Sequence, residues 1–128
     1  MGFDCDAEYR GGPGPNLVFC CSGAADVGEI GHRAARLLDD RGVASRFCLA
    51  GIGGGVEAML RKTRQAVRVL AIDGCKVGCA RKTLERAGFQ DFQRLCVGDL
   101  GIEKGKSPVT DERVQRVFER GSQILTRA

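Results

Sequence analysis

The residues of this chain with the clearest chemical potential are two cysteines that follow a short apolar run. Residues Val67–Ile72 are mostly β-branched or aliphatic and end at Asp73 and Gly74, a pair typical of a turn. Cys75 and Cys79 come next, at positions i and i+4, so both thiols face one side if the following helix includes Cys75 in its first turn. Two sulfurs on one helix face supply half of a tetrahedral metal site.

The cysteine content favours metal binding or thiol chemistry over structural disulfides. The chain has 128 residues and seven cysteines, an odd number that cannot pair completely within one chain. No apolar stretch reaches the ~20 residues of a membrane-spanning helix, and residues 1–16 lack the apolar centre of a signal peptide. We therefore expect a cytoplasmic protein that does not associate with membranes and whose cysteines stay reduced.

Charge and aromatic content argue against a nucleic-acid partner. The formal net charge is +4, and the 20 basic residues are interleaved with 16 acidic ones instead of forming a block. The chain has one Tyr and no Trp, so aromatic surfaces on which bases could stack are scarce. We expect no nucleic-acid binding, and the sequence points to no particular protein partner.

Apolar runs and helix signals alternate along the chain and predict an α/β fold. A Gly- and Pro-rich lead over residues 1–16, which contains Cys5, is expected to be flexible, and one domain should span residues 17–128. The predicted strands are 17–21, 45–50, 67–72 and 92–97, and the predicted helices are 26–42, 56–65, 75–88 and a last one from about 110. This order favours a small three-layer α/β domain, with a mainly parallel sheet of about four strands and helices on both faces.

Four cysteines should meet at one edge of this sheet. The carboxyl ends of parallel strands lie at one edge, where ligands bind, and neighbouring strands are about 4.8 Å apart. The cysteines at or just after the first three strand ends are Cys21, Cys48, Cys75 and Cys79. Thiolate ligands without histidine favour zinc or an iron–sulfur centre over hard cations. We therefore predict a four-thiolate metal site at this edge.

The other cysteines of the domain and the single histidine are expected to lie outside that site. Cys20 precedes Cys21 on the same strand, so its side chain should face the other side of the sheet and pack in the core. Cys96 lies within the last predicted strand and should also be a small buried residue. His32 lies inside the first predicted helix, away from the strand ends, where we expect a surface or packing role.

Several of these segments together resemble the DGC-domain family. The similar segments are Cys21–Gly23, Cys48–Gly53, Asp73–Cys75, Gly78–Glu85 and Asp99–Lys104, so the resemblance covers nearly all of the chain beyond the lead. The resemblance implies zinc binding through four cysteines, which fall on Cys21, Cys48, Cys75 and Cys79. The residues that would support this site are Ser22, Gly23, Asp73, Gly74 and Arg81. The resemblance implies no reaction, so the zinc would be structural or part of a metal or thiol sensor, and enzymatic activity stays open.

Two other chemistries remain open around Cys75. Cys75 and Cys79 could act in redox or sulfur-handling chemistry, by closing a disulfide or carrying a persulfide. The spacing of Cys75 and Arg81 also resembles the phosphate loop of protein tyrosine phosphatases. In that interpretation Cys75 would attack phosphorus, Arg81 would clamp the phosphate and Asp99 would be the acid. Because the loop lacks the glycine and hydroxyl pattern of those enzymes, zinc binding is the preferred interpretation.

Overall fold

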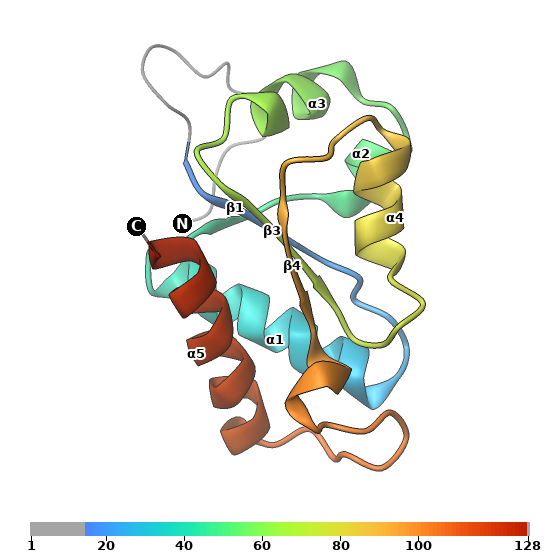
Figure 1. Ribbon diagram of the computed structural model, residues 1–128, viewed down its shortest axis with the longest axis vertical. Helices are drawn as coiled ribbons and strands as arrows, with labels where there is room; N and C mark the ends of the chain where they lie inside the picture. Colours follow the sequence, from blue (N-terminus) through green and yellow to red (C-terminus); the bar gives the residue numbers. More distant parts are fainter. Residues whose placement is uncertain (1–14, 128) are drawn as a thin grey trace.

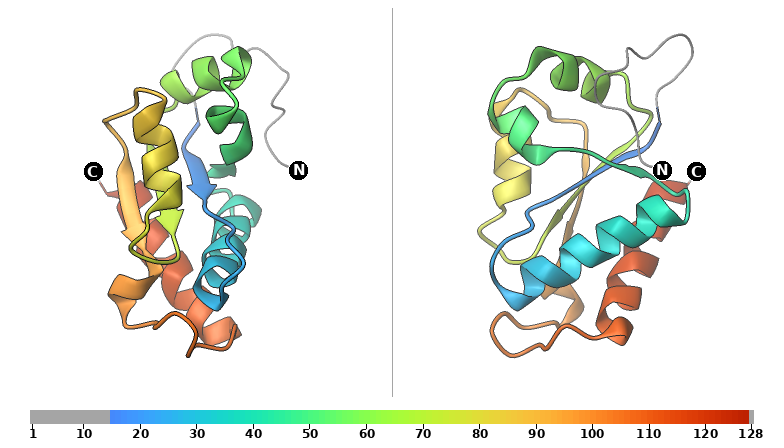
Figure 2. Two further views of the ribbon diagram at one scale, coloured as in Figure 1. Left: turned by 90° about the vertical axis from the view of Figure 1, so that its right-hand side faces the viewer. Right: turned by 180° about the vertical axis from the view of Figure 1, so that it is seen from behind.

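The computed structural model describes residues 15–127, in which a parallel sheet lies between two layers of helices (Figures 1 and 2). The strands are β1 (Leu17–Cys20), β2 (Ser45–Arg46), β3 (Val69–Asp73) and β4 (Gln93–Cys96), in the order β2-β1-β3-β4. The helices are α1 (Asp26–Asp40), α2 (Leu49–Gly53), α3 (Glu57–Arg64), α4 (Cys79–Arg86) and α5 (Asp111–Thr126), with a 3-10 helix at Val97–Leu100. All neighbouring strands are parallel. The predicted three-layer α/β fold is therefore confirmed.

Alternate residues of the central strands enter the two halves of the hydrophobic core. Val18 and Ile72 pack in the half that contains the buried faces of α1 and α5. Leu17, Phe19 and Ala71 pack in the other half, with buried residues of α2 and α4. Figure 1 shows α1 and α5 together on one side of the sheet and the shorter helices on the other. Because both faces are covered, β1 and β3 are apolar along almost their whole length, as is typical of parallel strands.

A glycine inside α5 allows that helix to lie close to α1 and to the sheet. A Cβ atom at Gly121 would lie 3.2 Å from Leu38 Cδ1 and 3.3 Å from Leu70 Cδ2. Those distances are tighter than ordinary carbon–carbon contacts, so a side chain at this position would push α5 outward. The close approach explains why a residue that weakens an isolated helix occurs in its middle.

The second predicted strand is wrong beyond its first two residues. β2 consists of Ser45–Arg46 alone, and residues 49–53, which were expected to be strand and loop, form α2. After Phe47, whose N–H still bonds to β1, the chain leaves the sheet, and Cys48 is the extended residue before the helix. Ile52 is then buried beside α4. A short apolar run fits a buried strand and a buried helix turn equally well, so the sequence pattern could not separate the two.

The third predicted helix begins later than expected. α4 starts at Cys79, so Cys75 lies in the turn that links β3 to α4, and the prediction that Cys75 and Cys79 share one helix face is wrong. Gly78, the residue before the helix, has a φ of 70°. This left-handed conformation, which glycine adopts readily, prevents the helix from extending back to Cys75.

The predicted lead falls mostly outside the residues that the structure describes. Residues 1–14, with Cys5, and residue 128 are not described, so flexibility over 1–16 stays a prediction. Pro15 and Asn16 are described, and their carbonyl groups accept hydrogen bonds from the N–H groups of Val67 and Ser45. Between residues 15 and 127, no helix combines the length and the apolar character needed to cross a membrane.

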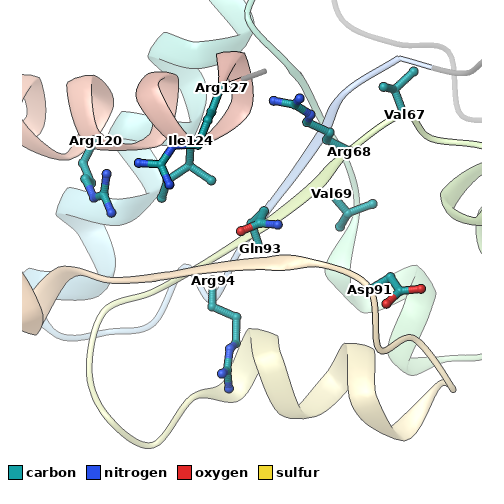
Figure 3. Close-up of a pocket in the computed structure, with 9 residues that line it drawn as sticks. All are labelled: Val67, Arg68, Val69, Asp91, Gln93, Arg94, Arg120, Ile124 and Arg127. Carbon is teal, nitrogen blue, oxygen red and sulfur yellow. The ribbon is translucent and has the colours of Figure 1, made fainter.

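The two ends of the sheet gather different side chains. The segments that leave its carboxyl edge carry cysteines, including Cys21 after β1 and Cys75 after β3. At the amino ends of β3 and β4, arginines line a pocket together with residues of α5 (Figure 3). Most of this basic pocket therefore lies at the opposite edge of the sheet from the thiols, although Arg94 lines both this pocket and that of Cys75.

Candidate functional site

The turn that carries Cys75 is held by the carboxylate of Asp73, the last residue of β3. Asp73 Oδ1 accepts a hydrogen bond from the N–H of Ala80 at 2.7 Å, and Oδ2 accepts one from the N–H of Arg81 at 3.1 Å. Gly78 at the N-cap position has no side chain to bond these amides, so the buried carboxylate of Asp73 replaces a conventional cap. Asp73 thus ties the end of β3 to the start of α4.

Gly74 lies where two loops meet the first turn of α1. A Cβ atom at Gly74 would lie 2.7 Å from the backbone N of Gly28, and one at Gly28 would lie 2.7 Å from the carbonyl oxygen of Gly23. Only glycine permits such close backbone contacts. The N–H of Gly74 also donates a hydrogen bond to Cys21 Sγ at 3.4 Å. We call this contact of Gly23, Gly28 and Gly74 the glycine crossing; it places the Cys21 thiol beside the turn that contains Cys75.

Cys21 and Cys48 line one pocket, which has a volume of about 540 Å³. Thr83 of α4 lines the same pocket. Cys79 precedes Thr83 by one helical turn, its side chain is exposed, and its carbonyl accepts a hydrogen bond from the Thr83 hydroxyl at 2.7 Å. The structure therefore brings two of the four predicted ligands together and places the third one turn away on a helix that borders their pocket.

Cys75 faces a different, neighbouring pocket of about 400 Å³. It packs against the half of the core that contains α1 and α5, whereas Cys21 packs against the other half. Arg81 and Cys96 line the pocket of Cys75, and burial raises the pKa of the Cys96 thiol. Between residues 15 and 127, no three or more His, Cys, Asp or Glu side chains are grouped so that they could hold a metal ion.

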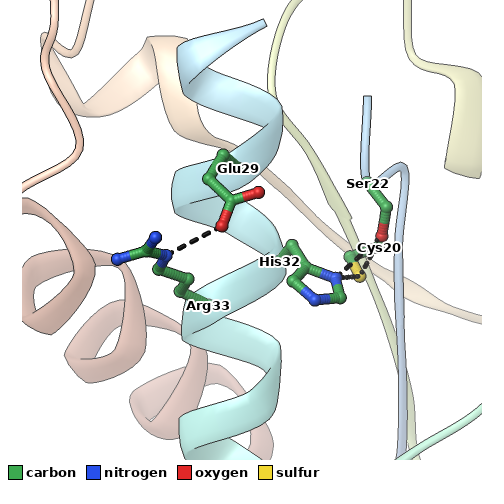
Figure 4. Close-up of polar contacts among 5 residues, drawn as sticks. All are labelled: Cys20, Ser22, Glu29, His32 and Arg33. Carbon is green, nitrogen blue, oxygen red and sulfur yellow. Dashed lines mark hydrogen bonds and ion pairs between the residues drawn. The ribbon is translucent and has the colours of Figure 1, made fainter. Parts of the chain in front are cut away.

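The pocket of Cys21 also contains a polar cluster that the sequence analysis missed. His32 Nδ1 lies 3.0 Å from Ser22 Oγ and 3.8 Å from Cys20 Sγ, and these two side-chain atoms are 3.1 Å apart (Figure 4). The expectation that His32 lies away from the strand ends is wrong, because α1 begins a short loop after β1 and its second turn borders this pocket. The sequence did contain a signal for this position of His32: the predicted helix begins only a few residues after Cys21, so its first turns must lie near the end of the strand.

Cys20 packs in the core only in part, and the nearby residue Ser22 has a strained backbone. Cys20 packs against the α1 side of the core, as expected, but its thiol also lines the pocket of Cys21. Burial raises the pKa of the Cys20 thiol, which favours its protonated form at neutral pH. Ser22 has a φ of 49°, a left-handed conformation that residues other than glycine rarely adopt. Such backbone strain is concentrated at functional sites in proteins.

A loop from the C-terminal part of the chain contacts Cys75 at one point. Lys104 Nζ lies 3.8 Å from Cys75 Sγ. The loop is anchored on Asp26, whose Oδ1 accepts a hydrogen bond from the N–H of Gly105 at 2.9 Å and whose Oδ2 accepts one from the N–H of Ser107 at 3.0 Å. These bonds, first that of Gly105 and then that of Ser107, lower the pKa of the Asp26 carboxyl group.

Asp26 should make the stability of the protein sensitive to acid. Its pKa is lower in the folded than in the unfolded chain, so its contribution is complete above the unfolded pKa of about 4 and is lost as the pH falls through the folded value. We expect Asp26→Asn to flatten this dependence when the urea midpoint is measured from neutral to strongly acidic pH. Asp40→Asn, at an exposed position at the end of α1, is the control and should keep the parent's acid profile. Identical profiles for Asp26→Asn and the parent would contradict the prediction.

Fold and site together define a small, all-parallel α/β protein with cysteine-bearing loops at the carboxyl edge of its sheet. The DGC domain matches residues 17–120, most of the chain, so this protein belongs to the DGC-domain family and the predicted resemblance is confirmed. It is 30% identical over 111 residues to the anaerobic and virulence modulator AnvM of Pseudomonas aeruginosa strain PAO1, a match that covers 86% of this chain and 85% of AnvM. No solved structure matches the chain significantly.

Proposed function

We propose that this protein is a regulatory module that binds one zinc ion through Cys21, Cys48, Cys75 and Cys79. The observation that carries the proposal is that these four cysteines are free, stand on separate segments at one edge of the sheet and are all at least partly accessible. Thiolates are among the ligands that zinc prefers. The resemblance to the DGC-domain family implies the same four ligands.

The arrangement of the four thiols supports a site that closes when metal binds. Cys21 and Cys48 already share a pocket, and Cys79 lies on a helix that borders it. Cys75 is the thiol that would have to change orientation, and it lies in an accessible turn in which Val77 is 54% exposed. Metal binding commonly orders such loops, because the ligands reach their final positions only when they coordinate the ion. Four thiolates leave no open position for a substrate, so zinc would fix the conformation of these loops.

Nearby cations support the proposed ligand set. Four thiolates and one divalent ion carry a formal charge of about two minus, which basic side chains would offset. Lys104 lies 3.8 Å from Cys75 Sγ, and Lys76 and Arg81 line the same pocket as Cys75. The relative AnvM is named a modulator, which agrees with a module whose metal content or thiol state is read by another molecule.

Metal analysis tests the proposal directly. Protein purified under reducing, anaerobic conditions should contain about one zinc per chain by mass spectrometry. Cys75→Ser should lose most of this zinc, because one of the four ligands is removed. Cys96→Ser is the matched control, since its thiol lines the same pocket as Cys75 but lies outside the proposed ligand set, and it should keep the zinc. Folded, metal-free protein that takes up no zinc, or full zinc content in Cys75→Ser, would reject the proposal.

A second candidate function, redox or sulfur-handling chemistry at Cys75, is favoured by the position of Lys104. Lys104 Nζ lies 3.8 Å from Cys75 Sγ, so a cationic group stands beside this partly accessible thiol. The phosphatase-like version is disfavoured, although Arg81 and Asp99 line the pocket of Cys75. Two of the helix amides that would bind a phosphate already donate to the carboxylate of Asp73. Rapid alkylation of Cys75 in protein that takes up no zinc would favour the redox function.

A further inference from the structure

We propose that a second site, at the opposite edge of the sheet from the cysteine-bearing loops, binds the phosphate group of a small organic molecule. The site is the pocket at the amino ends of β3 and β4, which has a volume of about 420 Å³. Four arginines line it: Arg68, Arg94, Arg120 and Arg127. They come from three parts of the chain: the residue before β3, strand β4, and the end of α5 with the residue that follows it. The proposal does not depend on zinc binding.

The positive charge of this pocket is not balanced within the described part of the chain. Asp91 is the acidic residue of the lining, and between residues 15 and 127 no ion pair joins a carboxylate to any of the four arginines. The C-terminal end of α5 contributes the equivalent of about half a negative charge. Even without Arg94, which also lines the pocket of Cys75, three guanidinium groups against one carboxylate and this dipole leave a positive excess, which an anionic ligand would offset.

Three of the arginines and one amide are arranged around a common space. Arg68 Nη1 donates a hydrogen bond to the carbonyl of Leu125 at 2.8 Å, which fixes Arg68 beside the last turn of α5 and leaves its other N–H groups free for a ligand. Figure 3 shows Arg68, Arg120 and Arg127 on the α5 side of the sheet with Gln93, whereas Arg94 extends from β4 toward α4. Planar guanidinium groups bind phosphate through paired hydrogen bonds, so this arrangement fits a phosphate group.

The shape and the apolar part of the lining indicate a ligand larger than phosphate itself. A volume of about 420 Å³ lies in the range of pockets that bind small organic molecules. Val67, which is 56% exposed, and Ile124 provide apolar surface beside the arginines. The lining therefore combines groups that bind a phosphate with a surface that suits a sugar or a base. A hollow of this kind favours a small molecule over an extended polymer.

Titration followed by amide NMR tests this site with three probes: AMP, inorganic phosphate and adenosine. AMP at millimolar concentration should shift the amide signals of residues 67–69, 93–94 and 120–127, whereas adenosine should not. Tighter binding of AMP than of inorganic phosphate supports an organic phosphate, and equal binding supports the anion site but assigns it to free phosphate. Absence of shifts at these residues with both phosphates would overturn the proposal.

A double variant with a matched control separates a binding role from a structural one. Arg120→Gln combined with Arg127→Gln should weaken AMP binding at least tenfold, because two charge-assisted contacts are lost. Arg86→Gln changes an exposed arginine of α4 outside the pocket and should leave the affinity unchanged. Without ligand, the double variant should melt close to the parent, since neither arginine is paired with a carboxylate in the described chain and Arg120 makes only a long 3.5 Å hydrogen bond to Gln123. Unchanged affinity in the double variant would also overturn the proposal.

Discussion

Gly74→Ala should destabilise the protein by about 3 kcal/mol or more, or prevent folding altogether. The added methyl group would lie 2.7 Å from the backbone N of Gly28 and 2.8 Å from the carbonyl carbon of Val27. Backbone atoms of a helix cannot move aside as a flexible side chain can, so α1 and the turn after β3 would have to separate. That separation would also break the hydrogen bond from the Gly74 N–H to Cys21 Sγ. Urea denaturation measures the change in the free energy of unfolding.

Gly53→Ala is the matched control for this substitution. Gly53 is the last residue of α2, and its added methyl group would lie 3.6 Å from Thr83 Cγ2, an ordinary van der Waals contact. Alanine is the better helix former, so the control should be neutral or slightly stabilising, by up to about 1 kcal/mol. Equal stability of Gly74→Ala and Gly53→Ala would show that the glycine crossing tolerates a side chain.

Asp73→Ala should lower the free energy of unfolding by about 3 kcal/mol, because two amides at the start of α4 lose their acceptor inside the protein. Asp73 is 6% exposed, and its carboxylate accepts hydrogen bonds from the N–H groups of Ala80 and Arg81. Asp73→Asn should lower the free energy of unfolding by roughly half as much. The side-chain oxygen of asparagine can still accept one of the two hydrogen bonds, but its NH₂ group faces the other backbone N–H and cannot accept. Chemical denaturation gives the stability, and hydrogen exchange at Ala80 and Arg81 reports the helix start.

Asp99→Ala tests whether the effect belongs to the hydrogen bonds or to the loss of any acidic group near Cys75. Asp99 is exposed and lines the same pocket as Asp73, so its removal should change stability by less than about 0.5 kcal/mol. If Asp73→Ala were as mild as Asp99→Ala, the carboxylate of Asp73 would not be what holds the turn.

The apolar patterning was sufficient to predict the layers of this protein, but not the conformations of its turns. β1 and β3 are continuous apolar runs, and α1 and α5 carry apolar residues at helical spacing, so their types followed from periodicity. The cysteine at position 75 was placed in a helix because nothing in the pattern shows that Gly78 adopts a positive φ. Cys75 lies before the helix and lines a different pocket from Cys21 and Cys48, and the four-cysteine ligand set stays a prediction.

Groupings of residues that are distant in the sequence were beyond the reach of pattern analysis. The basic residues alternate with acidic ones along the chain, which suggested an even charge distribution. Folding nevertheless brings Arg68, Arg120 and Arg127 to one pocket, because the amino end of β3 lies beside the last turns of α5. His32 joins Cys20 and Ser22 for a similar reason, since α1 runs back along the strand that precedes it. Both groupings depend on the packing of whole elements, which local periodicity does not encode.

The glycine crossing has a mechanical consequence for the thiols on either side of it. At Gly23, Gly28 and Gly74 the backbones of two loops and a helix touch with no side chain between them. Side-chain layers can absorb a small displacement by changing rotamers, whereas touching backbones pass it on. We therefore expect the loop after β1 and the turn after β3 to move together, so that a displacement of the backbone at Cys21 also displaces the backbone at Cys75.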